Sequence, residues 1–169
     1  MTPDPTQVQV RAACAADAPA IAALYNHHVL HTTITFEDTA VSGSDIEQRI
    51  AACAAHGLPW LIAHERESLL GYAYGGQWRT RAAYRFAAES TIYLTPQASG
   101  QGLGTRLYNA LLAELRSRSL HCAIGGIALP NAASVALHEK LGFRQVAHFQ
   151  QVGFKLGRWI DVGYWQLLL

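Results

Sequence analysis

The chain has 169 residues, of which half are hydrophobic and 15% are charged, so it carries enough apolar material for one ordinary folded domain spanning 1–169. A net charge of +1 gives no electrostatic reason to expect nucleic acid or a membrane as a partner. No apolar run approaches the roughly 20 residues of a membrane span, no signal peptide is recognisable, and three scattered cysteines suggest neither disulfides nor a metal site, so we expect a cytoplasmic protein.

The first third of the chain predicts one strand and two helices. A short strand is expected at 8–13, and apolar residues spaced three to four apart predict a helix at 17–31. Residues 32–42 have no helical period and predict an irregular loop. The sequence Ser44-Asp45-Ile46-Glu47 is typical of a capping box that opens a second helix, and Gly57 is typical of its end.

The rest of the chain alternates strands and helices. Strands are expected at 59–64, 69–77 and 87–94, and a leucine stripe predicts a helix at 102–118. A buried strand at 122–128 precedes a helix at 131–141, which Asn131 caps and Gly142 ends, and two final strands are expected at 144–152 and 160–167. The order β-α-α-β-β-β-α-β-α-β-β predicts an α/β fold on a mixed sheet of about seven strands with about four helices.

A glycine-rich turn follows the third of these middle strands. Gly100, Gly102 and Gly104 lie just before a predicted helix, where glycine allows the backbone to approach a ligand closely. Amide groups at a helix N-terminus favour phosphate. Neither the Rossmann fingerprint nor the Walker A sequence fits this spacing. An ordinary strand-to-helix turn is the alternative interpretation of the same residues.

Two signatures together resemble the GCN5-related N-acetyltransferase superfamily. The strand Ile92–Leu94 followed by Gly100–Gly104 looks like its pyrophosphate-binding motif, and Asn131–Ser134 with Leu141–Phe143 looks like its second signature. One departure is Ser99, which stands where the family usually has Gln or Arg. The resemblance implies the acetyltransferase fold and acetyl-CoA as co-substrate, held here mainly by backbone N–H groups.

Further stretches, spread over nearly the whole chain, resemble the phosphinothricin and methionine sulfoximine acetyltransferases. They are Tyr25–Val29, Thr33–Glu37, Gly76–Arg79, Glu89–Tyr93, Leu137–Glu139 and Gly157–Val162. The resemblance implies direct transfer of an acetyl group from acetyl-CoA to the α-amine of a phosphinothricin-like, methionine sulfoximine-like or methionine sulfone-like amino acid. It also implies a homodimer.

Two residues are candidates for proton transfer. An amine attacks only in its neutral form, so the reaction needs a base. The resemblance places the family's catalytic glutamate at Glu89, for which a surface carboxylate is the alternative. His138 stands where the wider superfamily has Tyr, and we expect it to relay a proton, with a purely structural histidine as the alternative.

The remaining candidates bind the two substrates. The resemblance implies that CoA is bound by Ile92, Tyr93, Leu94, Gly100, Gln101, Gly102, Leu103, Gly104, Thr105, Asn131 and Lys140. Acceptor contacts are expected from Phe36, Trp78, Arg79, Thr80, Arg81, Glu89, Ser90 and Thr91, with the arginines holding a carboxylate. A solvated charge run and ordinary aromatic packing are the alternatives for this second set.

Other functions remain open from sequence. His27, His28 and His31 have a possible metal spacing, but no Cys or carboxylate cluster accompanies them, so no metal is expected. Another small amine, such as a polyamine or an aminoglycoside, is an alternative acceptor, although the basic segment 79–85 disfavours a cation. A non-catalytic acyl-CoA-binding module is the second alternative, although it would need neither Glu89 nor His138.

Overall fold

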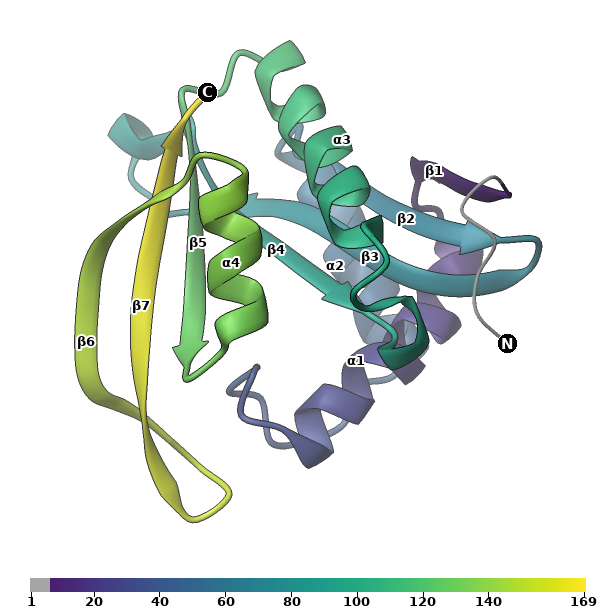
Figure 1. The fold of residues 1–169 in the computed structure, drawn as a ribbon. Helices are drawn as coiled ribbons and strands as arrows, with labels where there is room; N and C mark the ends of the chain where they lie inside the picture. The colour runs from purple at the N-terminus through teal and green to yellow at the C-terminus, as the bar shows by residue number, and fades with distance from the viewer. Residues whose placement is uncertain (1–6) are drawn as a thin grey trace.

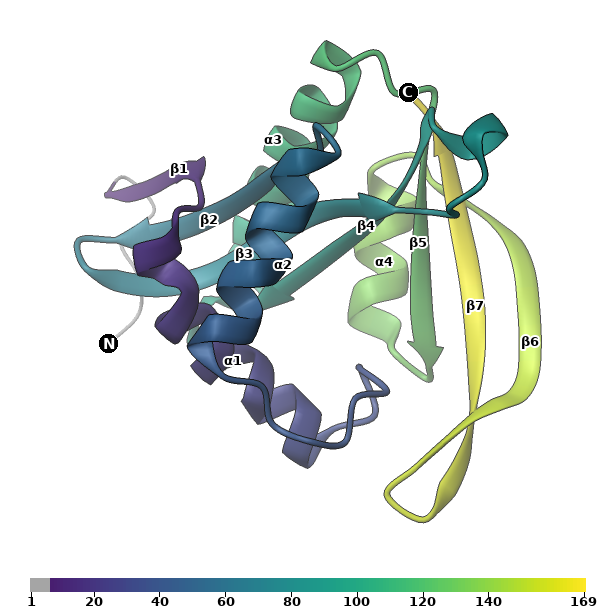
Figure 2. The same ribbon diagram turned by 180° about the vertical axis from the view of Figure 1, so that it is seen from behind.

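The computed structural model describes residues 7–169, which form a seven-stranded sheet with helices on both faces (Figures 1 and 2). The sheet order is β1-β2-β3-β4-β5-β7-β6. The strands are β1 (Val8–Ala12), β2 (Trp60–Glu65), β3 (Ser68–Gln77), β4 (Ala87–Leu94), β5 (Cys122–Leu129), β6 (Arg144–Lys155) and β7 (Arg158–Leu168). The helices are α1 (Ala18–His31), α2 (Gly43–Ala55), α3 (Leu103–Ser117) and α4 (Ala132–Lys140). The predicted fold class and element order are confirmed.

Helices α3 and α4 cover one face of the sheet, and α1 and α2 cover the other (Figures 1 and 2). The predicted leucine stripe of α3 is confirmed, because Leu107, Leu111 and Leu115 are fully buried against the sheet. A second apolar cluster lies under α1 and includes Ile21 and Trp60. No helix within residues 7–169 is long and apolar enough to cross a membrane.

The sheet opens between its two central strands. All neighbouring strands pair antiparallel except β4 and β5, which run parallel. Their pairing covers only three positions and ends at Glu89 opposite Ile124. Beyond this point the strands diverge (Figure 1), although each continues for five more residues. The divergence leaves one edge of β4 without a neighbouring strand, next to the glycine-rich turn.

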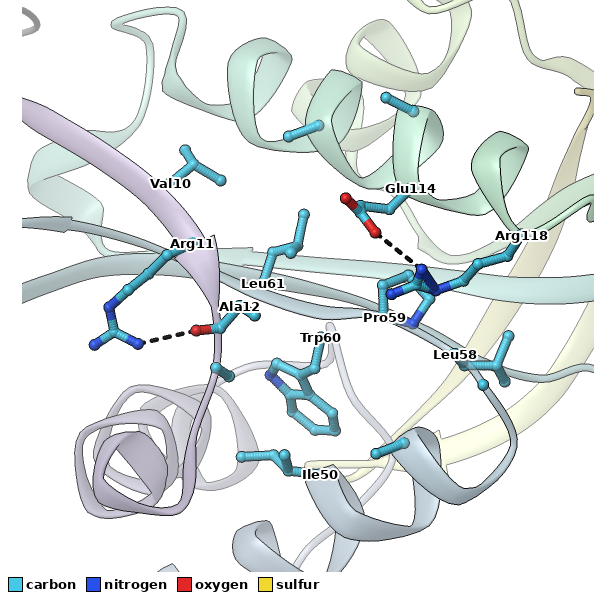
Figure 3. Close-up of a pocket in the computed structure, with 15 residues that line it drawn as sticks. Val10, Arg11, Ala12, Ile50, Leu58, Pro59, Trp60, Leu61, Glu114 and Arg118 are labelled. Carbon is cyan, nitrogen blue, oxygen red and sulfur yellow. Dashed lines mark hydrogen bonds and ion pairs between the residues drawn. The ribbon is translucent and has the colours of Figure 1, made fainter.

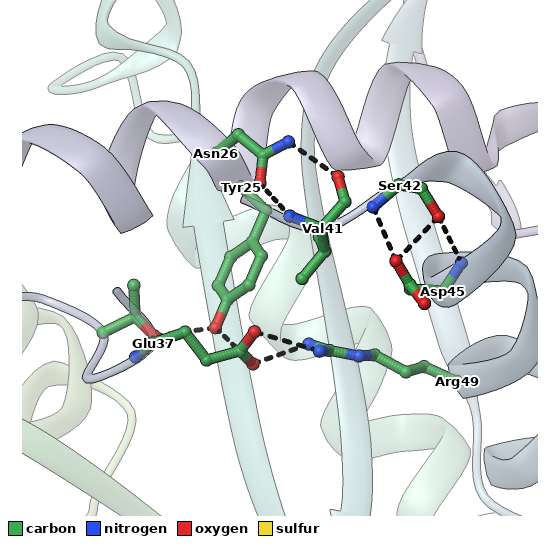
Figure 4. A network of polar contacts seen from close by, with 8 residues as sticks. Tyr25, Asn26, Glu37, Val41, Ser42, Asp45 and Arg49 are labelled. Atoms are coloured by element: carbon green, nitrogen blue, oxygen red, sulfur yellow. Dashed lines mark hydrogen bonds and ion pairs between the residues drawn. The ribbon is translucent and has the colours of Figure 1, made fainter. Parts of the chain in front are cut away.

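Helix α2 begins earlier than the sequence predicted. The capping residue is Ser42, whose hydroxyl accepts from the Asp45 N–H at 3.1 Å while the Asp45 carboxylate accepts from the Ser42 N–H at 2.7 Å (Figure 4). The predicted box at Ser44 and Glu47 is therefore wrong, because Ser44 already lies in the first turn of the helix. The predicted end is confirmed, since Gly57 follows the helix with a φ of 67°.

The final hairpin is longer than predicted. Strands β6 and β7 extend to a two-residue turn at Leu156 and Gly157, beyond the expected ends at 152 and 160. Gly153 therefore lies within β6. The hairpin tip reaches past the end of the sheet, toward the loop that follows α1 (Figure 1).

Candidate active site

A groove of about 450 Å³ lies at the opening between β4 and β5. Its walls come from the end of β4, the glycine-rich turn, the start of α3 and one side of α4. It is lined by His28, Ile34, Ile92, Tyr93, Leu94, Ser99, Gly100, Gly102, Gly104, Thr105, Asn131, Ala133, Ser134, Ala136, Leu137 and Lys140.

The glycine-rich turn is shaped to bring backbone close to a ligand. Gly100 and Gly102 adopt φ values of 75° and 80°, which favour glycine. A Cβ on Gly104 would lie 3.3 Å from Leu94 and 3.4 Å from Leu137, so the absent side chain keeps the groove wall close-packed. Gly102 is the N-cap of α3 and provides no side-chain cap, which leaves the first N–H groups of the helix available to an anion.

Most of the predicted cofactor residues line this groove, but two side chains do not. Leu103 is buried in the core under α3. The Gln101 side chain donates to the Gln97 carbonyl oxygen at 2.7 Å. The side chains of these two residues therefore serve the fold of the turn. Ser99 lines the groove and its hydroxyl donates to the Thr95 carbonyl oxygen at 3.3 Å.

On the opposite wall, Asn131 has the predicted capping role. Its Oδ1 accepts from the Ser134 N–H at 3.1 Å, which fixes the start of α4. Asn131 also lines the groove, so capping and ligand contact are compatible in this residue. Lys140, at the other end of α4, contributes a positive charge to the same wall.

A second cavity of about 410 Å³ adjoins the groove. We call it the acceptor cavity, because two of the predicted acceptor residues, Phe36 and Glu89, line it. Its lining consists of Ile34, Phe36, Glu89, Gly126, Ala128, Phe149, Val152, Val162 and Tyr164. Ile34 lines both cavities and so marks their junction. Glu89 is the one charged residue of this lining, and no cationic side chain takes part in it. The cavity can therefore receive an apolar group and place it beside a carboxylate.

The environment of Glu89 suits a base. Burial raises the pKa of its carboxyl group above the ordinary 4.5, and the positive charge of Arg79 opposes that rise. A Cβ on Gly126 would lie 3.5 Å from Glu89 Oε1 and 3.1 Å from the Tyr164 ring. The glycine thus preserves space directly beside the carboxylate, where an amine could be held.

The other predicted acceptor residues do not line this cavity. The Arg79 guanidinium lies 5.0 Å from the centre of the Trp78 ring, and Trp78 packs edge-on against Tyr164 at 5.6 Å. Thr80 and Arg81 form an exposed depression of about 380 Å³ together with Arg79 and Tyr84. Thr91 and Ser90 also lie outside the lining of the acceptor cavity. Of the predicted set, the structure brings Phe36 and Glu89 together.

His138 is enclosed in a hydrogen-bonded network and lines neither cavity. It is 3% exposed, and its Nδ1 lies 2.8 Å from the Ser134 carbonyl oxygen, so this nitrogen carries the proton. Its Nε2 then accepts from the Tyr108 hydroxyl at 3.0 Å, and that hydroxyl also bonds Ser90 Oγ at 2.7 Å. Burial lowers the pKa of His138, which favours a neutral imidazole.

Gly125 is a residue of this network that the sequence analysis missed. A Cβ at this position would lie 2.4 Å from His138 Nε2, so only glycine lets the ring pack against β5. The sequence carried a signal in the Gly125-Gly126 pair inside a strand, since glycine there often marks a close approach. The two glycines give room on opposite faces of β5, one to His138 and one to the acceptor cavity.

A larger cavity, of about 770 Å³, lies elsewhere in the molecule (Figure 3). Residues of β1, α2, β2 and α3 line it, mostly with apolar side chains, and the ion pair between Glu114 and Arg118 closes one side at 3.0 Å. None of the predicted site residues takes part. Size alone therefore does not identify the site, whereas the groove and the acceptor cavity combine shape with chemically suitable residues.

Comparison with known proteins finds related sequences and a related structure. The profile of the acetyltransferase (GNAT) domain family matches residues 10–163. The chain is 40% identical to the L-methionine sulfoximine/L-methionine sulfone acetyltransferase of Salmonella typhimurium, over 95% of this chain and 94% of the relative. It is 42% identical to a phosphinothricin N-acetyltransferase of Alcaligenes faecalis, over 86% and 74%. A Salmonella typhimurium protein solved with its cofactor acetyl-CoA superimposes with a TM-score of 0.93 at 38% identity, over 96% and 94%.

Proposed function

Because the chain belongs to the acetyltransferase (GNAT) domain family, we propose that it transfers the acetyl group of acetyl-CoA to the α-amine of an amino acid. The proposed acceptors are methionine sulfone, methionine sulfoximine and phosphinothricin, on which the relatives named above act. The observation that carries the proposal is the junction at Ile34 of an anion-binding groove with an apolar cavity that contains one carboxylate. The family match over 10–163 supports a single catalytic domain.

The groove has the features that CoA requires. Its turn would hold the pyrophosphate on backbone N–H groups at the start of α3, where Gly104 lets Leu94 and Leu137 pack closely in the groove wall. Asn131 would contact the pantetheine arm, and Lys140 would meet a phosphate. Acetyl-CoA supplies an activated thioester when bound. The unpaired edge of β4 from Thr91 to Leu94 would donate an N–H to the carbonyl oxygen as negative charge develops there.

Glu89 would accept the proton of the acceptor amine. Its carboxylate lies in the cavity next to the space kept by Gly126, and burial gives it a raised pKa suited to a base. Arg79, whose positive charge acts on Glu89, would hold the acceptor carboxylate together with Arg81. The proton-relay role of His138 stays a prediction, and its contacts with Ser134 and Tyr108 give more support to a positioning role.

A thiol-release assay with acetyl-CoA tests this function against a panel of amines. We expect turnover of methionine sulfone, methionine sulfoximine or phosphinothricin, and none of a polyamine or an aminoglycoside. Turnover of a cationic amine alone would replace the proposed acceptor. Binding of acetyl-CoA with no turnover of any amine would instead indicate a non-catalytic binding module.

We also propose a homodimer that works in the cytoplasm. The hairpin of β6 and β7 exposes several large apolar side chains, and β6 is an edge strand of 12 residues. Phe154, Leu156 and Trp159 are 59–62% exposed near its tip. Light scattering coupled to gel filtration should give twice the monomer mass, and Trp159→Lys should yield monomers. A wild-type monomer would contradict the proposal.

A further inference from the structure

Lys155 is a buried cation that the proposed reaction does not use. It lies at the end of β6 and is 5% exposed. Its Nζ donates to the Thr35 carbonyl oxygen at 2.7 Å and reaches the His28 carbonyl oxygen at 3.5 Å. Within residues 7–169 it forms no ion pair, and its hydrogen bonds go to these two main-chain oxygens. Burying an ammonium group is costly unless it is well hydrogen-bonded, so this contact constrains both segments.

Thr35 belongs to the loop 32–42, which is fixed to α1 and α2 on its other side (Figure 4). Glu37 forms two hydrogen bonds to Arg49, at 2.7 and 3.0 Å, and accepts a third from the Tyr25 hydroxyl at 3.0 Å. Asn26 forms two hydrogen bonds with the backbone of Val41, both at 2.8 Å. The loop is therefore anchored at its middle and its end, and its first part faces the hairpin.

A second contact joins the same loop to the same hairpin. The ring of Phe36 packs directly on the backbone of Gly153, where an added Cβ would lie 2.3 Å from Phe36 Cζ. Gly153 is buried, and any side chain there would displace the ring. Lys155 and Gly153, two residues apart on β6, thus hold consecutive residues of the loop.

The acceptor cavity lies where these contacts meet. Ile34 and Phe36 form the part of its wall that comes from the loop, and Phe149 and Val152 of β6 form a neighbouring part. We propose that Lys155 is a positioning residue, which fastens the loop 32–42 to β6 and so sets the width of the acceptor cavity. The contact of Phe36 with Gly153 sets how large an acceptor side chain fits. This inference rests on the proposed function.

The test compares Lys155→Met, which keeps the length of the side chain but removes its donors, with Lys155→Arg, which keeps the charge and donors. The matched control is Arg158→Met, which removes an exposed cation of the same hairpin. The contact of Arg158 with Thr33 Oγ1 is weak, because the two atoms lie 3.5 Å apart. For Lys155→Met we expect the KM of the acceptor to rise roughly tenfold or more, on the scale of one lost charged hydrogen bond. The KM of acetyl-CoA should change less than about twofold, because the turn and α4 bind it. Lys155→Arg should recover part of the loss, and Arg158→Met should match wild type.

Amide hydrogen exchange of residues 32–42 gives a readout independent of turnover. Faster exchange there in Lys155→Met, with unchanged exchange in α3, supports the role of Lys155 in holding the loop to β6, even if no tested amino acid is an acceptor. Unchanged exchange overturns the inference. An unchanged acceptor KM, or equal rises in both KM values, also overturns it, while leaving the proposed function intact. Failure of wild type to acetylate any amino acid contradicts the proposed function alone.

Gly153→Ala keeps the test informative if Lys155→Met does not fold. The added methyl group should displace Phe36 and raise the acceptor KM, again with little change in the KM of acetyl-CoA. Adding Phe36→Leu to Gly153→Ala removes the ring that clashes and should relax the preference toward larger apolar side chains. An unchanged side-chain preference in both variants would overturn the role assigned to this contact.

Discussion

Tyr108→Phe separates a positioning role of His138 from proton relay. The substitution removes a hydroxyl that bonds His138 Nε2 at 3.0 Å and Ser90 Oγ at 2.7 Å, in a fully buried environment. His138 Nε2 is left without its donor, at a cost of about 1–3 kcal/mol. Without Tyr108 the Ser90 hydroxyl can donate to the Ile124 carbonyl oxygen, 3.4 Å away, so its loss is smaller, about 1 kcal/mol. We expect the free energy of unfolding to fall by roughly 2–4 kcal/mol.

Urea unfolding followed by circular dichroism measures this change, and the melting temperature should fall by roughly 5–15 °C for a chain of this length. Tyr84→Phe is the matched control, since Tyr84 is 43% exposed and its variant should stay within about 0.5 kcal/mol of wild type. A Tyr108→Phe variant as stable as this control would refute the bonding network described above.

The activity of the same variant addresses the relay. Neither Tyr108 nor His138 lines the groove or the acceptor cavity, so we expect kcat/KM to stay within about tenfold of wild type below the melting temperature. A loss of about 10² or more, with normal binding of acetyl-CoA, would show that protons pass through the Tyr108 hydroxyl and would restore the catalytic role of His138.

Four further predictions follow from the site. Glu89→Gln should lower kcat/KM by roughly 10² or more, whereas Glu114→Gln should have no effect; a near wild-type rate would contradict the role of Glu89 as base. Because the pKa of Glu89 is raised above 4.5, the rate of the wild type should begin to fall at a pH above 4.5 as the pH decreases. Gly102→Val should abolish the thermal stabilisation by CoA, whereas Gly157→Val, with a similar φ of 75° far from the groove, should retain it. Methionine sulfone should be acetylated with a kcat/KM roughly tenfold or more above that of phosphinothricin, because the phosphinothricin side chain carries a negative charge and no cation lines the acceptor cavity. Equal kcat/KM values would refute this. Burial lowers the pKa of His138 and His28 below 6.5, so near this pH the unfolded chain binds protons that the folded chain does not. The free energy of unfolding should therefore fall as the pH decreases from about 7.5 to about 5.5, and a flat profile would contradict this.

The sequence was most informative where a structural feature depends on residues that are adjacent in the sequence. The glycine-rich turn was predictable because its φ values of 75° and 80° require glycine at Gly100 and Gly102, and the helix start follows directly. The range of β4 was also predicted correctly, because the residues that indicate a strand follow one another directly in the sequence. The error at Ser44 arose because two serines lie two residues apart and either could start a helix.

The acceptor cavity could not be predicted in the same way. Its apolar wall joins the loop after α1 to β5, β6 and β7, so Ile34 and Tyr164 become neighbours across most of the chain length. The environment of His138 was equally hidden, because Tyr108 lies 30 residues earlier and reaches it only through packing of α3 against α4. A histidine in a helix has the same sequence appearance whether it faces a ligand or the core.

The divergence of β4 and β5 would let the two proposed substrates, bound from different sides of the sheet, react with each other. Side chains alternate along β4, so Ser90 faces the core under α3 while Glu89 faces the side on which α1 lies. The groove is walled mainly by α3 and α4, whereas the acceptor cavity includes the loop after α1. A continuous sheet would separate the two. Because the pairing ends at Glu89, the proposed base would lie at the first position where the acetyl donor and the amine can meet.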